Sequence, residues 1–448
     1  MIKSTYIKTS ILSTILLLIG VQTQAQNVLA LSLDSVVAQA IENNWQVKKT
    51  EAQLGMAKAD LMQANAAFLP NINISETFMN TTDPLNVFGF KLKQEIVTAS
   101  DFNPSLLNDP DAITNFTTRI AVEQPILNFD AFAGRGAAAS NKKASELNLQ
   151  WTKNLIALKA KQLYFNLQLA SKQKVVLENS KDALAENHKV TQQFYEEGLI
   201  QKVNLLEMEL RMNGIETKLL ETENQINEVN LQLTHFLGLS MNINIIPTDS
   251  IQDYTGINLE QTANKVSENR SDLQAISFQL EASKRMLNSS KMGFLPRLNA
   301  FGSYEWNEDK AFGTLANNYM VGAKLEWDIF KGGKNIGKFQ KMKHQQHLMQ
   351  ISYDEKLSDS QRKLVKVKQQ LTLSKKHVEL SQLAVAQSEE AYKIKADRYT
   401  EGLEKTADIL VAESLMLNKK LAALKSVNYY QQLIFNLELL LEQEIIKK

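Results

Sequence analysis

The sequence predicts a mainly α-helical fold with a small β part, in which long helices pair as coiled-coil hairpins. Three observations predict it. Two long tracts contain no proline, one of them carries a heptad pattern of apolar residues, and short segments elsewhere alternate between apolar and polar residues. The composition agrees, because 448 residues with only 7 prolines and 17 glycines, rich in leucine, lysine and glutamate, are typical of long helices.

The proline-free tracts set where long helices can form. No proline lies between Pro125 and Pro247, and none follows Pro296. A proline inside a helix costs about 3 kcal/mol, so a tract without one permits an uninterrupted helix. These tracts therefore allow helices far longer than those of an ordinary globular protein.

One similar phrase interrupts each tract, at 194–199 and at 398–403. Its glycine can end a helix in a left-handed conformation and let the chain turn back. We therefore expect helix-turn-helix hairpins at about 135–240 and about 335–445. A first arm of about 60 residues would extend about 90 Å at the rise of an α-helix.

The return arm of the first hairpin carries two apolar stripes. The main stripe advances in steps of three and four, as in a coiled coil, and a polar residue interrupts it only at Thr222. The second, weaker stripe contains Leu206, Leu210 and Leu220. Two stripes favour a helix that touches a neighbour on either side, as in a tube of helices. A single antiparallel coiled coil remains the alternative.

The chain also repeats itself. A Glu-Asn pair followed by Phe-Leu-Pro recurs at an offset of 226 residues, and the two turn phrases recur at an offset of 204. The difference of 22 residues fits an insertion in the Pro-, Asn- and Asp-rich stretch 80–114. We expect one structural repeat over 26–247 and a second over 248–448, each with a helix, a strand region and a long hairpin.

The first 25 residues predict a secretory signal peptide. Lys3 and Lys8 precede an apolar run at 11–19, and Thr23 and Ala25 offer small residues for cleavage after Ala25. The run is shorter than the roughly 20 residues that a transmembrane helix needs. The chain is therefore expected to be exported.

Four segments with period-two alternation predict strands at about 71–80, 115–127, 297–306 and 319–330. One face of each segment is apolar and the other is polar, although Glu76 interrupts the apolar face of the segment at 71–80. Four charged residues are expected to face water inside a channel: Arg119, Glu123, Lys324 and Glu326.

Period two alone favours an ordinary half-buried antiparallel sheet. Export, strands of about 10 residues and a sheet whose edges need partners favour a membrane barrel instead. Four strands cannot close a barrel, whereas three subunits would supply 12, an ordinary barrel size.

No pattern of catalytic or metal-binding residues stands out. The chain has no cysteine, and 50 basic against 49 acidic residues leave a net charge of +1, without a basic stripe for nucleic acid. His344 and His347 lie on one helix face without supporting ligands, and the Gly332-Gly333-Lys334-Asn335 segment lacks phosphate-loop spacing. We predict neither an enzyme nor a metal or cofactor site.

Taken in order, these features resemble the TolC family of outer-membrane efflux channels. The residues that carry the resemblance are the two Phe-Leu-Pro segments at 68–70 and 294–296, the strand exits at 124–129 and 327–333, and the turns at 195–199 and 399–403. The match extends over about 30–445 and includes the duplication.

The resemblance implies a homotrimer in which the hairpins form an α-barrel, topped by a 12-stranded transmembrane β-barrel with four strands per chain. It implies a bacterial outer-membrane location with extension into the periplasm. The function would be that of a passive exit duct in a tripartite multidrug efflux or type I secretion system. Implied partners are a periplasmic adaptor (membrane fusion) protein, an inner-membrane RND or ABC pump and outer-membrane lipid.

The resemblance also implies roles at the two turns. Adaptor docking would use Tyr195, Gly198, Leu199, Gly402 and Leu403, and the periplasmic entrance would use Tyr399, Glu404, Asp408 and Asn204.

This chain departs from the best-known members at the entrance. Glu404 stands where they carry an arginine, and Asn204 stands where they carry an acidic residue. A lock would then need other residues, and we hypothesise that Lys405 or Lys202 pairs with Glu404 or Asp408. For the whole chain, a periplasmic coiled-coil scaffold or chaperone is the alternative function, and the cargo (drug, metal or protein) stays open.

Overall fold

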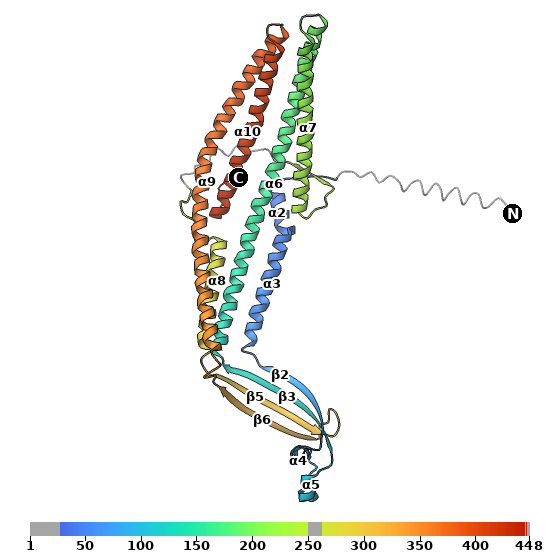
Figure 1. Cartoon of the computed structure of the whole chain (residues 1–448), viewed down its shortest axis with the longest axis vertical. Helices are drawn as coiled ribbons and strands as arrows, with labels where there is room; N and C mark the ends of the chain where they lie inside the picture. Colours follow the sequence, from blue (N-terminus) through green and yellow to red (C-terminus); the bar gives the residue numbers. More distant parts are fainter. Residues whose placement is uncertain (1–26, 250–261, 444, 446–448) are drawn as a thin grey trace, which may run out of the picture. The chain divides into compact units, whose positions relative to one another are not determined.

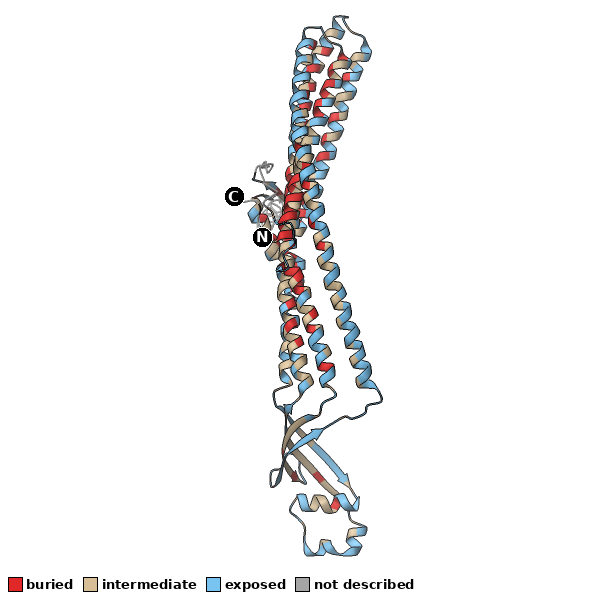
Figure 2. Ribbon diagram, turned by 90° about the vertical axis from the view of Figure 1, so that its left-hand side faces the viewer, coloured by how far each residue is buried: buried red, intermediate tan, exposed pale blue. Residues whose placement is uncertain are grey.

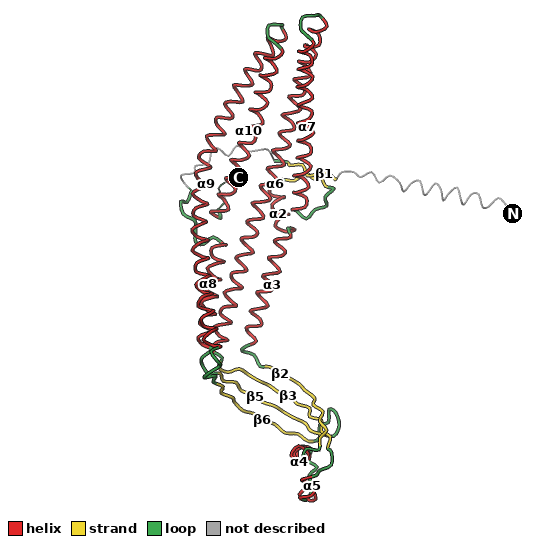
Figure 3. Tube along the Cα trace, in the orientation of Figure 1, coloured by secondary structure: helices red, strands yellow, loops and turns green. Residues whose placement is uncertain are grey.

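The computed structural model describes residues 27–249, 262–443 and 445 and has a mainly helical fold with a small β part, which confirms that prediction (Figures 1 and 3). The expected signal peptide, residues 1–25, lies outside the described residues. No helix within 27–249 and 262–443 is both long and apolar enough to cross a membrane.

The chain divides into two compact units, which are described separately below. Unit 1 comprises Met1–Lys48, Thr152–Val266 and Ser360–Lys448. Unit 2 comprises Lys49–Trp151 and Ser267–Asp359.

Four long helices form two hairpins. Helix α6 (Phe129–Glu196, 68 residues) returns as α7 (Lys202–Phe236, 35 residues), and α9 (Lys334–Thr400, 67 residues) returns as α10 (Thr406–Leu441, 36 residues). The hairpins expected at about 135–240 and 335–445 correspond to these pairs, and α6 begins six residues earlier than expected, directly after the strand that precedes it.

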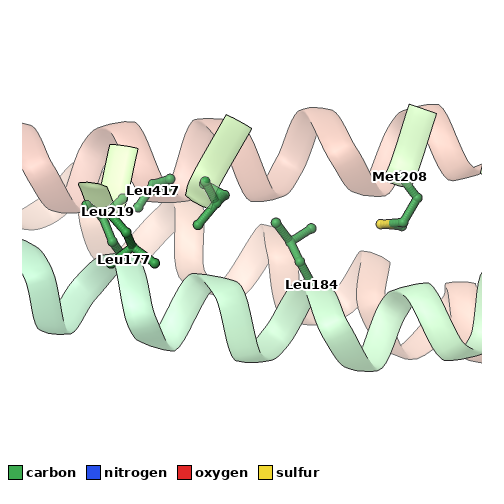
Figure 4. Close-up of a cluster of buried hydrophobic side chains, with 6 residues drawn as sticks. Leu177, Leu184, Met208, Leu219 and Leu417 are labelled. Carbon is green, nitrogen blue, oxygen red and sulfur yellow. The ribbon is translucent and has the colours of Figure 1, made fainter. Parts of the chain in front are cut away.

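Within unit 1, α6 and α7 pack as an antiparallel coiled coil. Leu177 and Leu184 of α6 meet Met208, Ile215 and Leu219 of α7 in a buried cluster that Leu417 of α10 completes (Figure 4). Buried positions therefore run along the inner side of both hairpins (Figure 2). Thr222 fits this seam because its hydroxyl donates to the carbonyl oxygen of Lys218 at 2.8 Å.

Charged pairs flank this seam at heptad spacing. Nζ–Oε distances are 2.8 Å for Lys174–Glu223 and 2.6 Å for Lys181–Glu216. The hydrogen bonds that both lysines donate to these glutamates raise the pKa of both lysines. The next step along both helices is His188 with Glu209, 3.8 Å apart. Each step advances seven residues on α6 and returns seven on α7, as an antiparallel coiled coil requires.

Unit 1 also holds a small parallel sheet that the sequence analysis does not anticipate. Strand β1 (Asn27–Leu31) pairs with β4 (Ile243–Pro247), and α2 (Leu33–Asn43) follows β1. The buried Tyr164 hydroxyl donates to the Leu31 carbonyl oxygen at 3.0 Å, and thus ties this sheet to α6. Five-residue strands carry too short an alternation to be recognised from sequence.

Unit 2 contains a four-stranded antiparallel sheet in the order β2-β3-β5-β6. Its strands are β2 (Asn71–Thr81), β3 (Ile113–Leu127), β5 (Arg297–Glu308) and β6 (Ala316–Glu326). Helices α3 (Trp45–Ala66) and α8 (Ser271–Met292) lead into β2 and β5.

The largest difference from the expected strand ranges concerns β6. It ends at Glu326 rather than at residue 330. Its partner β5 begins at Arg297, which pairs with Glu326, so β5 has no residue that could pair with the chain after Glu326. The chain then turns through Gly332 and Gly333, both at positive φ, into α9. The segment that faintly resembled a phosphate loop is thus a strand-to-helix turn.

The register separates an apolar face from a polar face. One row across the apolar face reads Ile72, Val122, Gly302 and Val321, and the polar rows between carry the charged residues. Ile74 is 70% exposed and Val321 74% exposed, so this single chain leaves its apolar face uncovered. Glu76 on that face accepts hydrogen bonds from the Thr118 hydroxyl (2.5 Å) and the Phe312 backbone N–H (3.2 Å).

An insert separates β2 from β3. It contains α4 (Pro84–Lys93), a 3₁₀ turn η1 (Ala99–Phe102) and α5 (Pro104–Asn108). These elements lie at the end of the sheet that is remote from α3 and α8 (Figure 1).

Candidate functional site

The two turns that join the long helices form the candidate site, and both belong to unit 1. Each turn glycine takes a left-handed conformation, with φ of 75° at Gly198 and 70° at Gly402. In both turns the glycine N–H and the leucine N–H donate back to the last helical turn, in the Schellman pattern: Gly198 to Tyr195 (3.0 Å), Leu199 to Phe194 (2.8 Å), Gly402 to Tyr399 (3.0 Å) and Leu403 to Arg398 (2.9 Å).

Each turn presents one leucine to solvent. Leu199 is 66% exposed and Leu403 is 65% exposed, while the flanking Tyr195 is 37% exposed. The backbone N–H groups of both leucines already donate hydrogen bonds within the turn, so each leucine presents only its apolar side chain to a partner. Such a leucine can bury apolar area against a partner without breaking a hydrogen bond.

Tyr399 and Tyr195 occupy matching positions but lie in opposite surroundings. Tyr399 is 1% exposed, and its hydroxyl lies 2.6 Å from the Thr191 hydroxyl and 3.2 Å from the Thr406 hydroxyl. The ring of Phe194 meets the Tyr399 ring edge-on at 5.9 Å. The tyrosine of the second turn therefore bonds to the first hairpin, and we call Tyr399, Thr191, Thr406 and Phe194 the tyrosine cluster.

A second polar contact between the hairpins lies further from the turns. Asn187 of α6 donates from Nδ2 to the Tyr392 hydroxyl oxygen of α9 at 2.9 Å. Burial raises the pKa of Tyr392, the hydrogen bond from Asn187 opposes this, and the negative charge of Glu413 adds to the rise. Tyr392 therefore stays protonated across the physiological range.

A third contact is an ion pair that the sequence analysis does not anticipate. Glu413 of α10 is fully buried, with Arg211 Nε donating to its Oε2 at 2.7 Å and Arg211 Nη2 lying 2.6 Å from the same oxygen. The Ser180 hydroxyl of α6 donates to the other oxygen, Oε1. A sequence signal did exist, because Glu413 lies between Ile409, Ala412, Met416 and Leu417, all buried on α10.

The expected entrance residues Glu404, Asp408 and Asn204 lie near these turns but are not joined to each other. Glu404 pairs with Arg398 of its own turn, with Arg398 Nε 3.1 Å from Oε2. Asp408 and Asn204 are half-buried in the first turns of α10 and α7. In the described part of the chain, neither Lys202 nor Lys405 forms an ion pair with Glu404 or Asp408, so the hypothesised lysine lock is not formed within this chain.

The four charged strand residues lie together on the polar face of the sheet in unit 2. Arg119 Nε lies 3.3 Å from Glu305 Oε1, and Lys324 Nζ lies 2.8 Å from Glu326 Oε2. Glu123 Oε1 accepts a long hydrogen bond from Asn299 at 3.4 Å. The register therefore gathers these residues on one polar face.

A metal site is not apparent in the described ranges, where no group of three or more His, Asp or Glu side chains could hold an ion.

Comparisons with known proteins agree on one family. The model of the family described as outer membrane efflux protein matches residues 36–239 and 262–441. A comparison with curated proteins finds no significant match.

Several solved structures share the fold. VceC, an outer membrane protein of Vibrio cholerae, is 17% identical with a TM-score of 0.77, over 92% of this chain and 97% of its own. The CmeC outer membrane channel of Campylobacter jejuni is 17% identical with a TM-score of 0.76, over 93% of this chain and 87% of its own. A membrane protein from Pseudomonas aeruginosa is 17% identical with a TM-score of 0.79, over 91% of this chain and 92% of its own.

Proposed function

The chain belongs to the outer membrane efflux protein family, and we propose that it is the outer-membrane channel subunit of a tripartite efflux or secretion system. The resemblance to TolC-like channels drawn from the sequence is confirmed by this family match and by the shared fold. Members of this family are channel proteins rather than enzymes. The proposed subunit is a passive duct, and a pump in the inner membrane supplies the energy.

The observation that carries the proposal is the four-stranded sheet of unit 2, with its exposed apolar face and its half-paired edge strands. Its apolar face is uncovered, and each of its edge strands, β2 and β6, is paired on one side only. An isolated sheet of this kind would aggregate unless its edges and its apolar face found partners. Three copies joined edge to edge would close a 12-stranded barrel with apolar residues toward lipid and Arg119, Glu123, Lys324 and Glu326 toward water.

Exposed heptad stripes on the long helices support a homotrimer. On α7 the second stripe is exposed, with Leu206, Leu210 and Leu220 at 51%, 71% and 60%. Helix α9 carries exposed Leu373, Leu380, Leu383 and Ile394. Such stripes are suited to coiled-coil contacts with neighbouring helices, which a trimeric α-barrel would supply.

Matched element lengths support the proposed tandem repeat over 26–247 and 248–448. Helices α3 and α8 both have 22 residues, α6 and α9 have 68 and 67, and α7 and α10 have 35 and 36. Each proposed repeat thus supplies one hairpin and two strands of the four-stranded sheet. Residues 1–25 would be a signal peptide, removed on export.

We place the periplasmic entrance at the two turns, by family resemblance. Leu199 and Leu403, set by Gly198 and Gly402 and flanked by Tyr195, would dock a periplasmic adaptor protein. The tyrosine cluster holds the second hairpin against the first, and Glu404, Asp408 and Asn204 would line the entrance beside it. Docking that favours a different packing of the hairpins would open the duct, because a partner shifts an equilibrium between two packings by its differential affinity.

The proposal is tested by fractionating cells that express the chain and by reconstituting it. We expect recovery with outer-membrane lipid, a heat-modifiable trimer on gels and discrete conductance steps in planar bilayers. Recovery as a soluble periplasmic monomer would instead favour the coiled-coil scaffold or chaperone.

Docking is tested separately with Leu199→Glu and Leu403→Glu. Both variants should still assemble as trimers and conduct in bilayers, but they should lose export when the adaptor and an RND or ABC pump are present. Unchanged export would remove these leucines from the docking surface.

A further inference from the structure

The insert between β2 and β3 is much longer than its counterpart between β5 and β6. It occupies residues 82–112, whereas the β5–β6 connection occupies only 309–315. It is also structured, since Asp83 caps α4 by accepting from the Asn86 N–H at 2.9 Å and Lys91 Nζ pairs with Asp101 Oδ1 at 2.8 Å.

The insert packs on the polar face of the sheet. Gln94 Nε2 donates to the Thr114 carbonyl oxygen and to Asn115 Oδ1, both at 2.8 Å. Lys93 Nζ lies 3.6 Å from Glu305 Oε2. Asn115 of β3 and Glu305 of β5 both belong to the polar rows.

The exposed fractions of the side chains also show that the insert covers the polar face. Three polar-face residues near this end of the sheet are almost inaccessible: Asn115 at 1%, Asn307 at 0% and Ala316 at 2%. Asn115 Nδ2 donates to Asn307 Oδ1 at 3.1 Å, so the two asparagines are joined beneath the insert. On the opposite, apolar face, Phe78 is 61% exposed and Tyr319 is 75% exposed.

This coverage is the reverse of that in a soluble α+β protein, where helices cover the apolar face of a sheet because burial of apolar area drives the packing. Here α4 leaves the apolar residues bare and lies over the asparagines and charges. The arrangement makes sense when the polar face is the inside of a channel and lipid covers the apolar face.

We propose that residues 82–112 form a cap that folds into the outer mouth of the channel and excludes large hydrophilic molecules arriving from outside the cell. The inference rests on the proposed function, since it needs the polar face to line a pore. Three caps, one from each subunit, would narrow the mouth at the end of the strands remote from the long helices, separately from the periplasmic entrance.

The attachment is suited to release. The ion pair between the insert and the sheet joins Lys93 Nζ to Glu305 Oε2 at 3.6 Å, and the Lys93 side chain is 47% exposed. A long ion pair with an exposed lysine stabilises weakly. Cargo leaving the duct can therefore displace the cap, while a bulky solute outside meets it in its closed position.

The test uses a chain that contains no cysteine, so a single introduced thiol can be labelled cleanly. Met320→Cys places the thiol on the polar face of β6, where Met320 is 51% exposed. Whole cells are treated with a small membrane-impermeant maleimide and with a bulky polyethylene glycol maleimide. The comparison is between the full chain and a variant in which a short Gly/Ser linker replaces 84–110.

We expect the small reagent to label Met320→Cys in both backgrounds. Labelling by the bulky reagent should rise at least about tenfold without the cap, since the width of the mouth sets passage. Lys310→Cys, in the exposed β5–β6 connection, is the matched control and should react with both reagents in both backgrounds. The double variant K93A/Q94A keeps the whole chain and should give an intermediate increase in labelling by the bulky reagent. It tests the cap even if the linker variant fails to assemble.

The outcomes separate the two proposals. Equal labelling by the bulky reagent with and without the insert, while the small reagent labels both, overturns the cap and leaves the channel intact. Failure of the small reagent to label Met320→Cys in either background, with Lys310→Cys labelled normally, overturns the assignment of the polar face to the pore.

Discussion

Arg211 of α7 donates a hydrogen bond to the fully buried carboxylate of Glu413 of α10, with 2.7 Å between Nε and Oε2. This contact joins the two hairpins of the chain at some distance from the turns. Ser180 of α6 donates to the other oxygen of the same carboxylate, so one side chain holds three helices.

Glu413→Gln is expected to lower the free energy of unfolding by about 2–3 kcal/mol, because Arg211 is left partly buried without its counterion. Glu209→Gln is the matched control, since Glu209 occupies the same place in the first hairpin but is 47% exposed, and it should cost at most about 0.5 kcal/mol. Denaturant unfolding in detergent measures both. Equal effects would show that the buried pair contributes nothing specific.

Tyr399→Phe removes the hydroxyl that lies near both Thr191 and Thr406 while keeping the ring against Phe194. We expect a loss of about 1 kcal/mol in the contact between hairpins and a larger open fraction in planar bilayers. Tyr195→Phe alters the exposed tyrosine of the other turn and should leave the open fraction unchanged. If both variants gate like the parent channel, the tyrosine cluster has no part in closure.

Gly402→Ala forces a side chain into a left-handed conformation at φ 70°. Because no heavy atom lies closer than 4.0 Å to the added carbon, the cost should be conformational, about 1–2 kcal/mol. Gly214→Ala lies inside α7 with open space around it and should instead stabilise by up to about 1 kcal/mol. Thermal unfolding of the two variants should therefore shift in opposite directions, and a common direction would contradict the assigned turn.

Asp272 at the start of α8 makes stability depend on acid pH. Burial alone would raise the pKa of Asp272, but hydrogen bonds from Arg270 and Lys356 outweigh it and hold the pKa below its ordinary value. A depressed pKa means that the contribution is complete above the ordinary aspartate pKa, about 4, and is lost as the pH falls through the folded value.

Asp272→Asn should therefore be less stable than the parent at neutral pH, by about 2 kcal/mol, and the difference should shrink in acid. Glu281→Gln, in an exposed pair with Arg285 on the same helix, is the control and should change little. Unfolding midpoints measured from neutral to strongly acid pH check both. A gap between parent and Asp272→Asn that persists in acid would exclude the assigned charge interaction.

Local signals determined much of the fold. Missing prolines and heptad spacing predicted the long hairpins, because helix formation and coiled-coil packing depend on residues three and four apart. Alternation predicted the four longer strands and assigned Arg119 and Lys324 to the same face, since a strand's side chains alternate strictly. The weak second stripe through Leu206 and Leu210 already marked the outer face of α7, which the structure leaves exposed.

The roles of individual polar residues depend on tertiary contacts, which the sequence pattern does not predict. Glu404 meets Arg398 rather than a lysine, and Glu413 meets Arg211, which is 202 residues away in the chain. The short strands β1 and β4 form only because distant segments pair.

By itself, the sequence determined the length and pairing of the helices, the turns at Gly198 and Gly402, and the two faces of the sheet, all of which follow from short-range periodicity. Only the tertiary structure decided which of two equivalent tyrosines is buried, which glutamate is paired inside the helices, and that the insert covers the polar face. The reason is physical: Tyr195 and Tyr399 share the same local backbone hydrogen bonds, but only Tyr399 meets Thr191 of the other hairpin, so the packing of distant segments makes the difference.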